Sequence, residues 1–329
     1  MEQSKTKKFI WRLLEIREVG AILPLLIGFL LFAFKSDKFL SADNMVNILR
    51  VASFTMICSI GEVYLLIAGS WDISISAVYS LGGVVAGLAM TQLGLPIWLS
   101  VVLALASGAL VGVINGILVQ KLEMAPFVAT VGTQFVARGF VQGITRGTPV
   151  YPLPDSFLKV GQENMNLFGI QVPWVVVIAL VLAVIAGLIL KYTTYGRRLY
   201  AAGGNGEAAR LAGIPTSKLR FGAFVLTGIM AALTGVLMAS RLGSAQATVG
   251  NGFEMIVIAG AVIGGISMAG GAGSIFGMAL GAFFMAMITN GMTLIKISAY
   301  WQTLVTGALL IFACSLEYVR NYLKLKLNS

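Results

Sequence analysis

Residues 73–120 read "ISISAVYSLGGVVAGLAMTQLGLPIWLSVVLALASGALVGVINGILVQ", which is 48 consecutive positions without Asp, Glu, Lys or Arg. Residues 255–295 and 164–190 are uncharged in the same way over 41 and 27 positions. About 20 apolar residues span a bilayer as a helix, so each of the two longest runs must hold two crossings, or one crossing and a re-entrant piece. A soluble core does not explain runs of this length. We therefore predict an integral membrane protein.

The composition of the whole chain agrees with this prediction. The mean hydropathy is +0.90, and only 11% of the 329 residues are charged, against about 25% in soluble domains. The alternating pattern typical of membrane β-barrels is missing, which leaves helices as the spanning elements. We predict an all-α polytopic membrane protein in which residues 1–329 form a single transmembrane domain.

Apolar segments predict about ten transmembrane helices, some of them interrupted or re-entrant, so that both chain ends lie on one side of the membrane. Fifteen Lys and Arg residues lie on that side and six on the other, and basic residues favour the cytoplasmic side. We expect the tails 1–18 and 318–329 and the loop 193–220 to be cytoplasmic. The predicted spans are 19–34, 44–68, 72–91, 96–119, 125–144, 173–192, 221–239, 254–267, 275–294 and 300–317.

Several spans contain small or polar interruptions. Gly61 and Glu62 interrupt the second span, while "GSWDISIS" (69–76) and "GGISMAGGAG" (264–273) place turns between apolar stretches. Non-helical backbone at membrane depth is tolerated where protein buries it or where it lines a wet cavity. Ordinary surface loops are an equally good interpretation, since glycine often only punctuates a chain. The segment 145–172 carries three prolines and is expected to be an extended outer loop.

The stretch "GNGEAARLAGI" (204–214) predicts a short helix outside the membrane. Asn205 can cap its start, and Glu207 falls in the first turn, where the helix dipole favours a carboxylate. Gly213 can close the helix in the left-handed conformation, and Pro215 prevents continuation. A helix of about two turns is unstable alone. It is either a plain surface connector or an element that docks a partner, and docking is favoured because a connector needs far fewer residues.

Three acidic residues lie in or near predicted spans: Glu62, Asp72 and Glu254. Burial of a carboxylate in the membrane is costly and therefore suggests function. Asp72 and Glu254 are also explained as dipole partners at helix starts. Glu62 lies in the middle of a span and is expected to face the bundle interior or to pair with a base such as Arg50 or Arg138.

Polar side chains within the spans are candidates for a translocation pathway. The same groups can instead join helices through hydrogen bonds. Gly108, Gly112 and Gly116, four residues apart, predict a closely packed helix face. The pathway candidates are Glu62, Asp72, Asn115, Gln134 and Asn290, with Thr130, Thr133 and Thr293 beside them.

Other functional classes find no support in the sequence. There is no His and only two Cys, Cys58 and Cys314, far apart in apolar segments, so no metal site is expected. The net charge of +10 follows the topology and does not predict a nucleic-acid partner. No catalytic constellation and no G-x-x-x-x-G-K-[ST] phosphate loop occurs. The chain is not expected to be an enzyme or to bind ATP by that route.

The spacing of Glu207, Ala208, Ala209 and Gly213 resembles the cytoplasmic "EAA" coupling loop of ABC importer permeases. The surrounding "YGRRLYAAGGNGEAARLAGIPTSKLR" (195–220) looks like the ribose-type sugar branch of that family. The likeness also covers "NILR" (47–50), "GSWDIS" (69–74), "SRLGSAQATVGNGFE" (240–254) and "GGISMAGGAGSIFG" (264–277).

This resemblance implies a permease subunit for a monosaccharide or sugar-like solute in a bacterial cytoplasmic (inner) membrane, surrounded by membrane lipid. The implied partners are cytoplasmic ABC ATPases that hold ATP and Mg, a second permease subunit, identical or different, and an extracytoplasmic solute-binding protein. Glu207, Ala208, Ala209, Arg210 and Gly213 are then the coupling residues that contact the ATPase.

The chain departs from the family pattern at a few positions, which leaves the solute open. Ser70 and Trp71 stand where the family shows "GI", Glu62 replaces a methionine, and Ala272 replaces a common lysine. Two other classes of function remain. One is a secondary transporter that uses Glu62 for ion coupling, and the other is a structural or assembly protein of the membrane.

Overall fold

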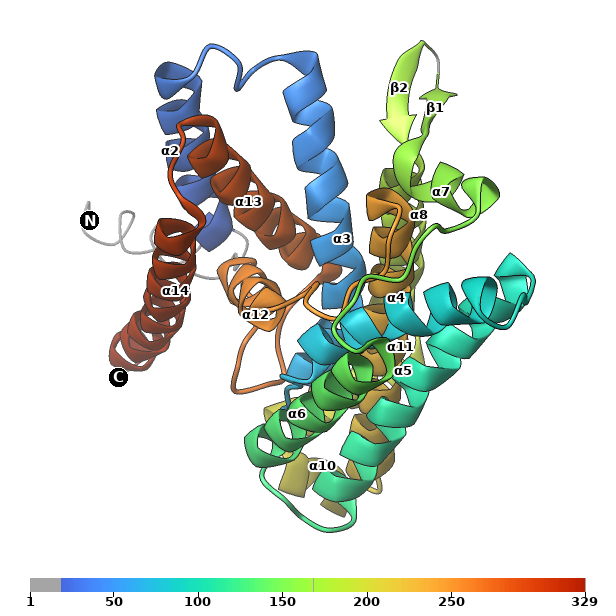
Figure 1. The fold of residues 1–329 in the computed structure, drawn as a ribbon. Coiled ribbons are helices and arrows are strands. Elements are labelled where there is room, and N and C mark those ends of the chain that lie inside the picture. Colours follow the sequence, from blue (N-terminus) through green and yellow to red (C-terminus); the bar gives the residue numbers. More distant parts are fainter. Residues whose placement is uncertain (1–18, 168, 329) are drawn as a thin grey trace.

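The computed structural model describes residues 19–167 and 169–328, and helices dominate this part of the chain (Figure 1). The predicted N-terminal tail 1–18 lies outside the described residues. The helices are α2 (Val19–Lys35), α3 (Ala42–Ile67), α4 (Ile75–Thr91), α5 (Ile97–Gln120), α6 (Pro126–Thr145), α7 (Asp155–Gln162), α8 (Trp174–Tyr192), α9 (Thr194–Gly204), α10 (Gly206–Leu211), α11 (Thr216–Leu242), α12 (Phe253–Ile263), α13 (Ile275–Leu294) and α14 (Ala299–Asn328), and the strands are β1 (Asn164–Leu167) and β2 (Ile170–Pro173).

Each of the ten predicted spans coincides with one helix, and the all-α prediction is confirmed. Among the described residues, five helices (α3, α5, α8, α11 and α13) are long and apolar enough to cross a membrane, and four more helices contain shorter apolar stretches. Helix α6 has 20 residues but belongs to neither group because its sequence is less apolar.

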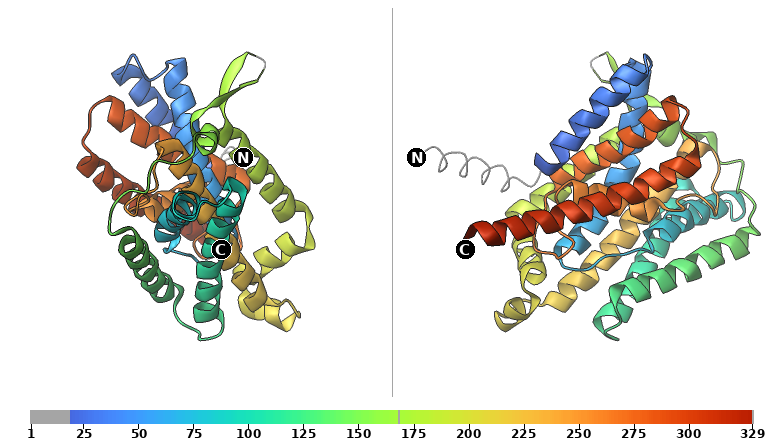
Figure 2. Two further views of the ribbon diagram at one scale, coloured as in Figure 1. Left: turned by 45° about the vertical axis from the view of Figure 1, so that its right-hand side comes forward. Right: turned by 90° about the vertical axis from the view of Figure 1, so that its left-hand side faces the viewer.

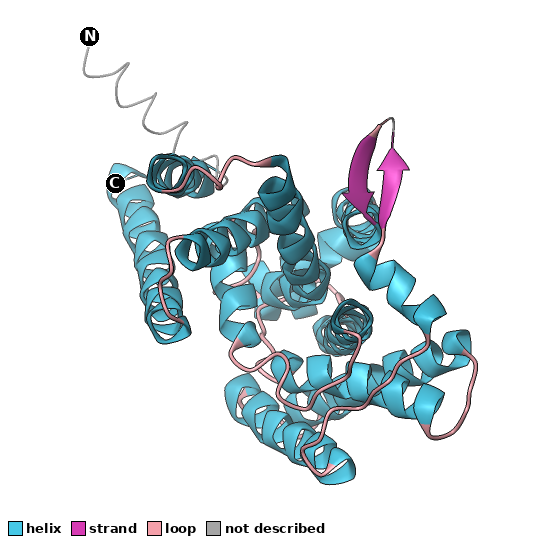
Figure 3. Cartoon of the chain, turned by 45° about the horizontal axis from the view of Figure 1, so that its top comes forward, coloured by secondary structure: helices cyan, strands magenta, loops and turns pink. Residues whose placement is uncertain are grey.

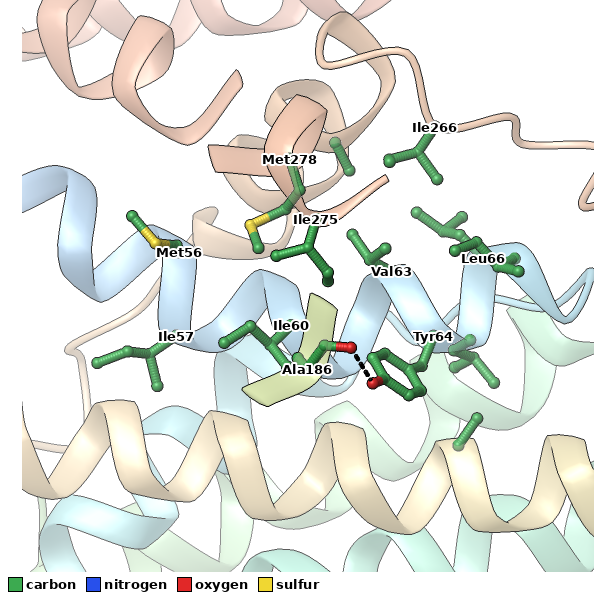
Figure 4. Packing of buried hydrophobic residues seen from close by; sticks show 14 of the residues in the cluster. Met56, Ile57, Ile60, Val63, Tyr64, Leu66, Ala186, Ile266, Ile275 and Met278 are labelled. Carbon is green, nitrogen blue, oxygen red and sulfur yellow. Dashed lines mark hydrogen bonds between the residues drawn. The ribbon is translucent and has the colours of Figure 1, made fainter. Parts of the chain in front are cut away.

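Helix α3 lies at the centre of the bundle. In its most apolar 18-residue window 83% of the residues are buried, and it packs against α8, α11, α12 and α13. Figure 4 shows this packing, with Ile60 and Val63 of α3 beside Ile275 of α13. The hydroxyl of Tyr64 donates to the backbone carbonyl of Ala186 in α8 at 2.7 Å, and this bond fixes the two helices against each other.

The prediction that Gly61 and Glu62 interrupt the second span is wrong, because α3 is continuous over 26 residues. Gly61 serves close packing instead. A Cβ atom at this position would lie 2.9 Å from the backbone nitrogen of Thr227 in α11. The predicted close-packed face of α5 is confirmed, since a Cβ at Gly108 would lie 2.6 Å from Ala232 and one at Gly112 would lie 2.7 Å from Val225.

The two other interruptions are partly buried in protein, with exposed residues such as Gly69 and Ala269 among them. In the segment 68–74, which joins α3 to α4, Ser70, Asp72 and Ser74 are all buried. In the segment 264–274, between α12 and α13, Ile266 and Ser267 are buried. Helix α12 has 11 residues, or about 16 Å of length, so it reaches only about half of a hydrocarbon core of about 30 Å.

The segment 145–172 is more structured than the extended loop that the sequence predicts. It contains α7 and, except for Pro173, the antiparallel hairpin β1–β2, in which Asn164 faces Pro173. Only its first part is extended, and there Val150 pairs with Ala245. The hairpin projects from the helices (Figure 3).

Helix α10 and the hairpin lie at opposite ends of the molecule (Figure 1), and the end of α14 lies on the side of α10 (Figure 2, right). We call these the α10 end and the hairpin end.

Candidate functional site

The short helix predicted from "GNGEAARLAGI" is confirmed as α10. Asn205 caps it, with the side-chain oxygen accepting a hydrogen bond from the backbone nitrogen of Ala208 at 3.0 Å. Gly213 has a φ of 78°, a conformation that glycine adopts without strain. The backbone nitrogen of Ile214 then donates to the carbonyl of Ala209 at 2.9 Å, which closes the last turn.

Helix α10 presents most of its side chains to solvent. Glu207, Ala208 and Arg210 are exposed, and Leu211 is 81% exposed. Ala209 is the buried member and attaches the helix to the rest of the molecule. An exposed leucine between charged groups forms a small mixed surface of the kind that protein partners contact.

The sequence did not predict helix α9, which precedes α10 and attaches it to the bundle. Thr193 caps α9 by accepting from the backbone nitrogen of Gly196 at 3.2 Å. The hydroxyl of Tyr200 donates to the carbonyl of Gly273 in the α12–α13 turn at 2.7 Å. Burial raises the pKa of this hydroxyl, so Tyr200 stays a hydrogen-bond donor at neutral pH. The adjacent glycines Gly203 and Gly204 are the sequence feature that could have indicated that the backbone of another segment lies close to this one.

Three segments meet in what we call the α9 junction. It consists of α9, the C-terminal end of α3 and the α12–α13 turn. The backbone nitrogen of Gly271 donates to the carbonyl of Ile67 at 2.9 Å. Arg220, in the first turn of α11, donates from Nε to the carbonyl of Ala68 at 2.9 Å and from its terminal nitrogen to the carbonyl of Ala202 at 3.3 Å. A displacement of α9 therefore acts directly on α3, α11 and the α12–α13 turn.

A second group of polar residues forms a buried network within the bundle. Asp72 accepts through Oδ1 from the backbone nitrogen of Ser74 at 2.7 Å and from its hydroxyl at 2.6 Å. Asn115 donates to Oδ2 of Asp72 at 3.0 Å, and Thr133 donates to Oδ1 of Asn115 at 2.6 Å. Oε1 of Glu62 accepts from the backbone nitrogen of Asp72 at 3.1 Å. The network joins α3, the segment 68–74, α5 and α6.

Glu62 faces the bundle interior and is fully buried, as expected. Its pairing with Arg50 or Arg138 is wrong: Arg50 donates to Asn164, and Arg138 donates to Ser80 and to backbone carbonyls. Within the described part of the chain, Oε2 of Glu62 has no hydrogen-bond partner.

The two acids explained as dipole partners lie differently. Glu254 is in the first turn of α12, where a carboxylate favours the helix. Asp72 lies ahead of α4, whose first residue is Ile75, and bonds to Ser74 and Asn115 instead. Its carboxylate accepts from the backbone nitrogen of Ser74, the N-cap residue of α4, so Asp72 lies at the start of that helix as well as in the polar network.

The remaining pathway candidates lie apart from each other. Gln134 donates to the hydroxyl of Ser76 at 2.9 Å, beside the polar network. Asn290 in α13 donates to Asn44 in α3 at 2.9 Å, and its own side-chain oxygen has no partner among the described residues. The bond between Asn290 and Asn44 joins two helices, which fits the interpretation that such polar groups hold the bundle together. A role of these residues in translocation stays a prediction.

A cavity of about 370 Å³ lies between α3, α4, α11, α12 and α13. Phe54, Thr55, Tyr79, Phe253 and Thr289 contribute to its walls. None of the predicted pathway residues lines it. Sequence reasoning missed these residues because apolar and aromatic side chains in a membrane helix are typical of ordinary packing, and only the fold brings them to one hollow.

Comparison with known proteins covers almost the whole chain. Residues 44–314 match the family described as "Branched-chain amino acid transport system / permease component". The ribose import permease protein of Haemophilus influenzae is 34% identical, over 94% of this chain and 94% of the relative. The xylose transport system permease protein of Escherichia coli K12 is 31% identical, over 90% and 89%.

The ribose import permease protein of Bacillus subtilis is 34% identical, over 92% of this chain and 93% of the relative. No solved structure matches the chain. The polar network, the loop that carries α10 and the cavity all lie within the matched residues 44–314. The chain is thus similar to permeases named for ribose import and for xylose transport. It belongs to the family of permease components described for the branched-chain amino acid transport system.

Proposed function

We propose that this chain is the membrane-spanning subunit of an ATP-driven ABC importer for a monosaccharide or sugar-like solute. The observation that carries the proposal is similarity over about nine tenths of the chain to permeases named for ribose import and xylose transport. The neutral solutes in those names are consistent with the absence of charged residues from the walls of the cavity, among the residues that the structure describes.

The proposed mechanism is alternating access driven from the α10 end. An ATPase on another chain binds ATP and Mg and contacts Glu207, Ala208, Arg210 and Gly213 of the loop, with Leu211 at the tip. ATP-driven closure of the ATPases moves α9 and α10, and the α9 junction passes this movement to α3, α11 and the α12–α13 turn. The pathway then opens toward the hairpin end to receive solute, and hydrolysis resets it.

The complete importer needs further partners. A second permease subunit, identical or different, completes the membrane part, and a solute-binding protein docks at the hairpin end. In this arrangement the α10 end, including the end of α14, is cytoplasmic, and the protein lies in a bacterial inner membrane. The tails and loops assigned to the α10 end carry fifteen Lys and Arg residues, against six at the hairpin end. This excess supports the orientation, because basic residues favour the cytoplasmic side.

One observation favours a second function, secondary transport with Glu62 as the coupling group. Glu62 is fully buried and, in the described part of the chain, Oε2 has no partner. Against it, Oε1 has a structural role, since it accepts from the backbone nitrogen of Asp72. Glu62→Gln keeps this acceptor and removes the charge. We expect ATP-driven uptake to persist in this variant, whereas loss of uptake with ATPase binding intact would favour ion coupling.

The experiment that tests the proposed function is copurification with the ATPase encoded beside this chain, followed by solute-stimulated ATP hydrolysis in liposomes. Glu207→Ala combined with Gly213→Ala should abolish stimulation, because the first change removes an exposed charge and the second strains a left-handed residue by about 1–2 kcal/mol.

The matched control lies at the hairpin end: Glu163→Ala with Gly147→Ala changes another exposed acid and another left-handed glycine, which has a φ of 71° and open space around it. Because the binding protein is proposed to dock at the hairpin end, both variants are also compared by copurification with the ATPase. Full solute-stimulated hydrolysis by the variant with the α10 changes would refute coupling through this helix.

A further inference from the structure

The cavity between α3, α4, α11, α12 and α13 has the size of a site for a small ligand. Its volume of about 370 Å³ lies near the lower end of the range of about 300–1,000 Å³ typical of ligand pockets. Met238 in its wall lies one turn before Arg241, which is in the last turn of α11. Arg241 in turn lies close to α7, since the Gln162 side chain donates to its carbonyl at 3.2 Å. The cavity therefore belongs to the hairpin end of the bundle.

The walls combine aromatic rings with uncharged polar groups. Phe54, Tyr79 and Phe253 supply the rings, and Tyr79 stacks on Phe253 with the ring centroids 4.9 Å apart. Thr55 and Thr289 add hydroxyl groups from two different helices. This combination suits a solute that has an apolar C–H face as well as hydroxyl groups, because rings pack against the face and hydroxyls donate and accept hydrogen bonds.

No charged side chain lines the cavity, among the residues that the structure describes. The cations beside the walls are engaged elsewhere: the guanidinium carbon of Arg241 lies 5.5 Å from the Phe54 ring centroid, and Arg138 donates to the carbonyl of Val249 at 3.1 Å and to the hydroxyl of Ser80 at 2.9 Å. A charged solute would lose its hydration here without gaining a partner of opposite charge, which is strongly unfavourable. A neutral solute carries no such penalty.

We propose that this cavity binds the transported solute directly and accepts uncharged, monosaccharide-sized polyols while rejecting sugar acids. The inference rests on the proposed function and narrows its substrate class. The Glu62–Asp72 network lies further along α3 toward the α10 end, since Glu62 follows Phe54 by eight residues, or about 12 Å. The solute therefore meets the neutral cavity before it meets the carboxyl groups of Glu62 and Asp72.

The test uses saturation-transfer NMR on the purified full-length chain, with ribose and xylose as neutral probes and glucuronate as the charged probe. This method detects the weak binding expected of a transport site. We expect signals from the neutral sugars and none from glucuronate. Equal signals from both classes, or signals from neither, would overturn the proposal. So would occupancy by a lipid acyl chain that sugars do not displace.

A matched pair of variants on α13 locates the binding. Thr289 lines the cavity and Thr293, one turn further on, does not. Each hydroxyl donates to the backbone carbonyl one turn earlier at 2.9 Å, and the Thr293 hydroxyl also accepts from the Gln302 side chain at 3.2 Å, so replacement by valine removes at least as much local bonding at the control position 293 as at 289. We expect Thr289→Val to weaken ribose binding by about 2–10-fold, the effect of one net hydrogen bond, and Thr293→Val to leave it unchanged. Identical binding by the two variants would refute the site.

Uptake measurements separate this inference from the proposed function. If the reconstituted importer takes up solute with ATP, but Thr289→Val and Thr293→Val transport equally, the function stands and the cavity proposal fails. If the unchanged importer shows no ATP-driven uptake, the proposed function itself fails, whatever the NMR signals show.

Discussion

The α9 junction depends on the absence of a side chain at Gly203. A Cβ atom at this position would overlap the carbonyl oxygen of Ile67 and lie 2.6 Å from the backbone nitrogen of Gly271, whereas ordinary contacts begin at 3.4 Å. It would enter the space of the hydrogen bond that these two groups form at 2.9 Å. Gly203→Ala must therefore push α9 away from the α12–α13 turn by about 0.8 Å to restore an ordinary contact with Gly271, and away from α3 by more than that, because the Ile67 contact is closer still.

The cost of this change follows from the contacts. Overpacking costs about 1–3 kcal/mol, and loss of the Gly271 to Ile67 hydrogen bond adds about 1 kcal/mol. Replacing glycine by alanine inside a helix returns about 0.5–1 kcal/mol. Gly204→Ala is the matched control, because the nearest atom to its Cβ is 3.9 Å away, and it should show only the favourable helix term. The two variants are expected to differ by about 2–4 kcal/mol.

The assay compares the two variants in the reconstituted importer. We expect Gly203→Ala to lower the apparent melting temperature of the permease in detergent and to reduce the solute transported per ATP hydrolysed, since α9 no longer transmits movement through the junction. Gly204→Ala should match the unchanged protein in both measurements. Equal behaviour of the two variants would refute the claim that the junction at Gly203 couples the loop to the bundle.

Three further predictions test the packing and the loop separately. Gly281→Ala should prevent assembly of a stable protein, because its Cβ would overlap the carbonyl of Gly260 in α12, while Gly139→Ala, with open space around it, should be tolerated when monodisperse yield is measured. Tyr64→Phe should lower thermal stability by about 1 kcal/mol, the value of its bond to α8, and an unchanged melting temperature would contradict that role. Asn205→Ala should destabilise α10 by about 1 kcal/mol and weaken ATPase binding in pull-down titrations, whereas Asn205→Asp, which retains the cap, should not.

Much of the fold was predictable because the membrane imposes it. A span needs about 20 apolar residues, so each uncharged run marks its helices, and every predicted span coincides with one. Helix α10 was equally predictable, since the cap at Asn205 and the left-handed Gly213 are local signals. The start of α11 was missed by several residues, because Thr216 to Arg220 continue the helix beyond the apolar segment into polar sequence.

The parts that the sequence did not predict depend on contacts between distant segments. Gly61 looked like an interruption, because glycine has a low intrinsic helix propensity. Its close packing against Thr227 becomes visible only when α11 lies beside it. Arg138 looked like a partner for a carboxylate, but backbone carbonyls at the end of the α11–α12 loop bind it instead. The cavity is formed by Phe54 and Phe253, which are far apart in sequence and have no local pattern that sets them apart from core residues.

The most direct test of the account is chemical cross-linking from the tip of α10. In a chain whose Cys58 and Cys314 are replaced by alanine, Leu211→Cys places a thiol at a position that is 81% exposed at the α10 end, and Tyr151→Cys places one at 70% exposure at the hairpin end. A short reagent that couples to the introduced thiol and carries a photoreactive group at its other end, applied to the importer, should join Leu211→Cys to the ATPase, with a yield that changes between the ATP-bound and ATP-free states, and should leave Tyr151→Cys unattached to it. Absence of any cross-link from position 211 to the ATPase, or an equal cross-link from position 151, would contradict the claim that α10 is where an ATPase acts on this permease.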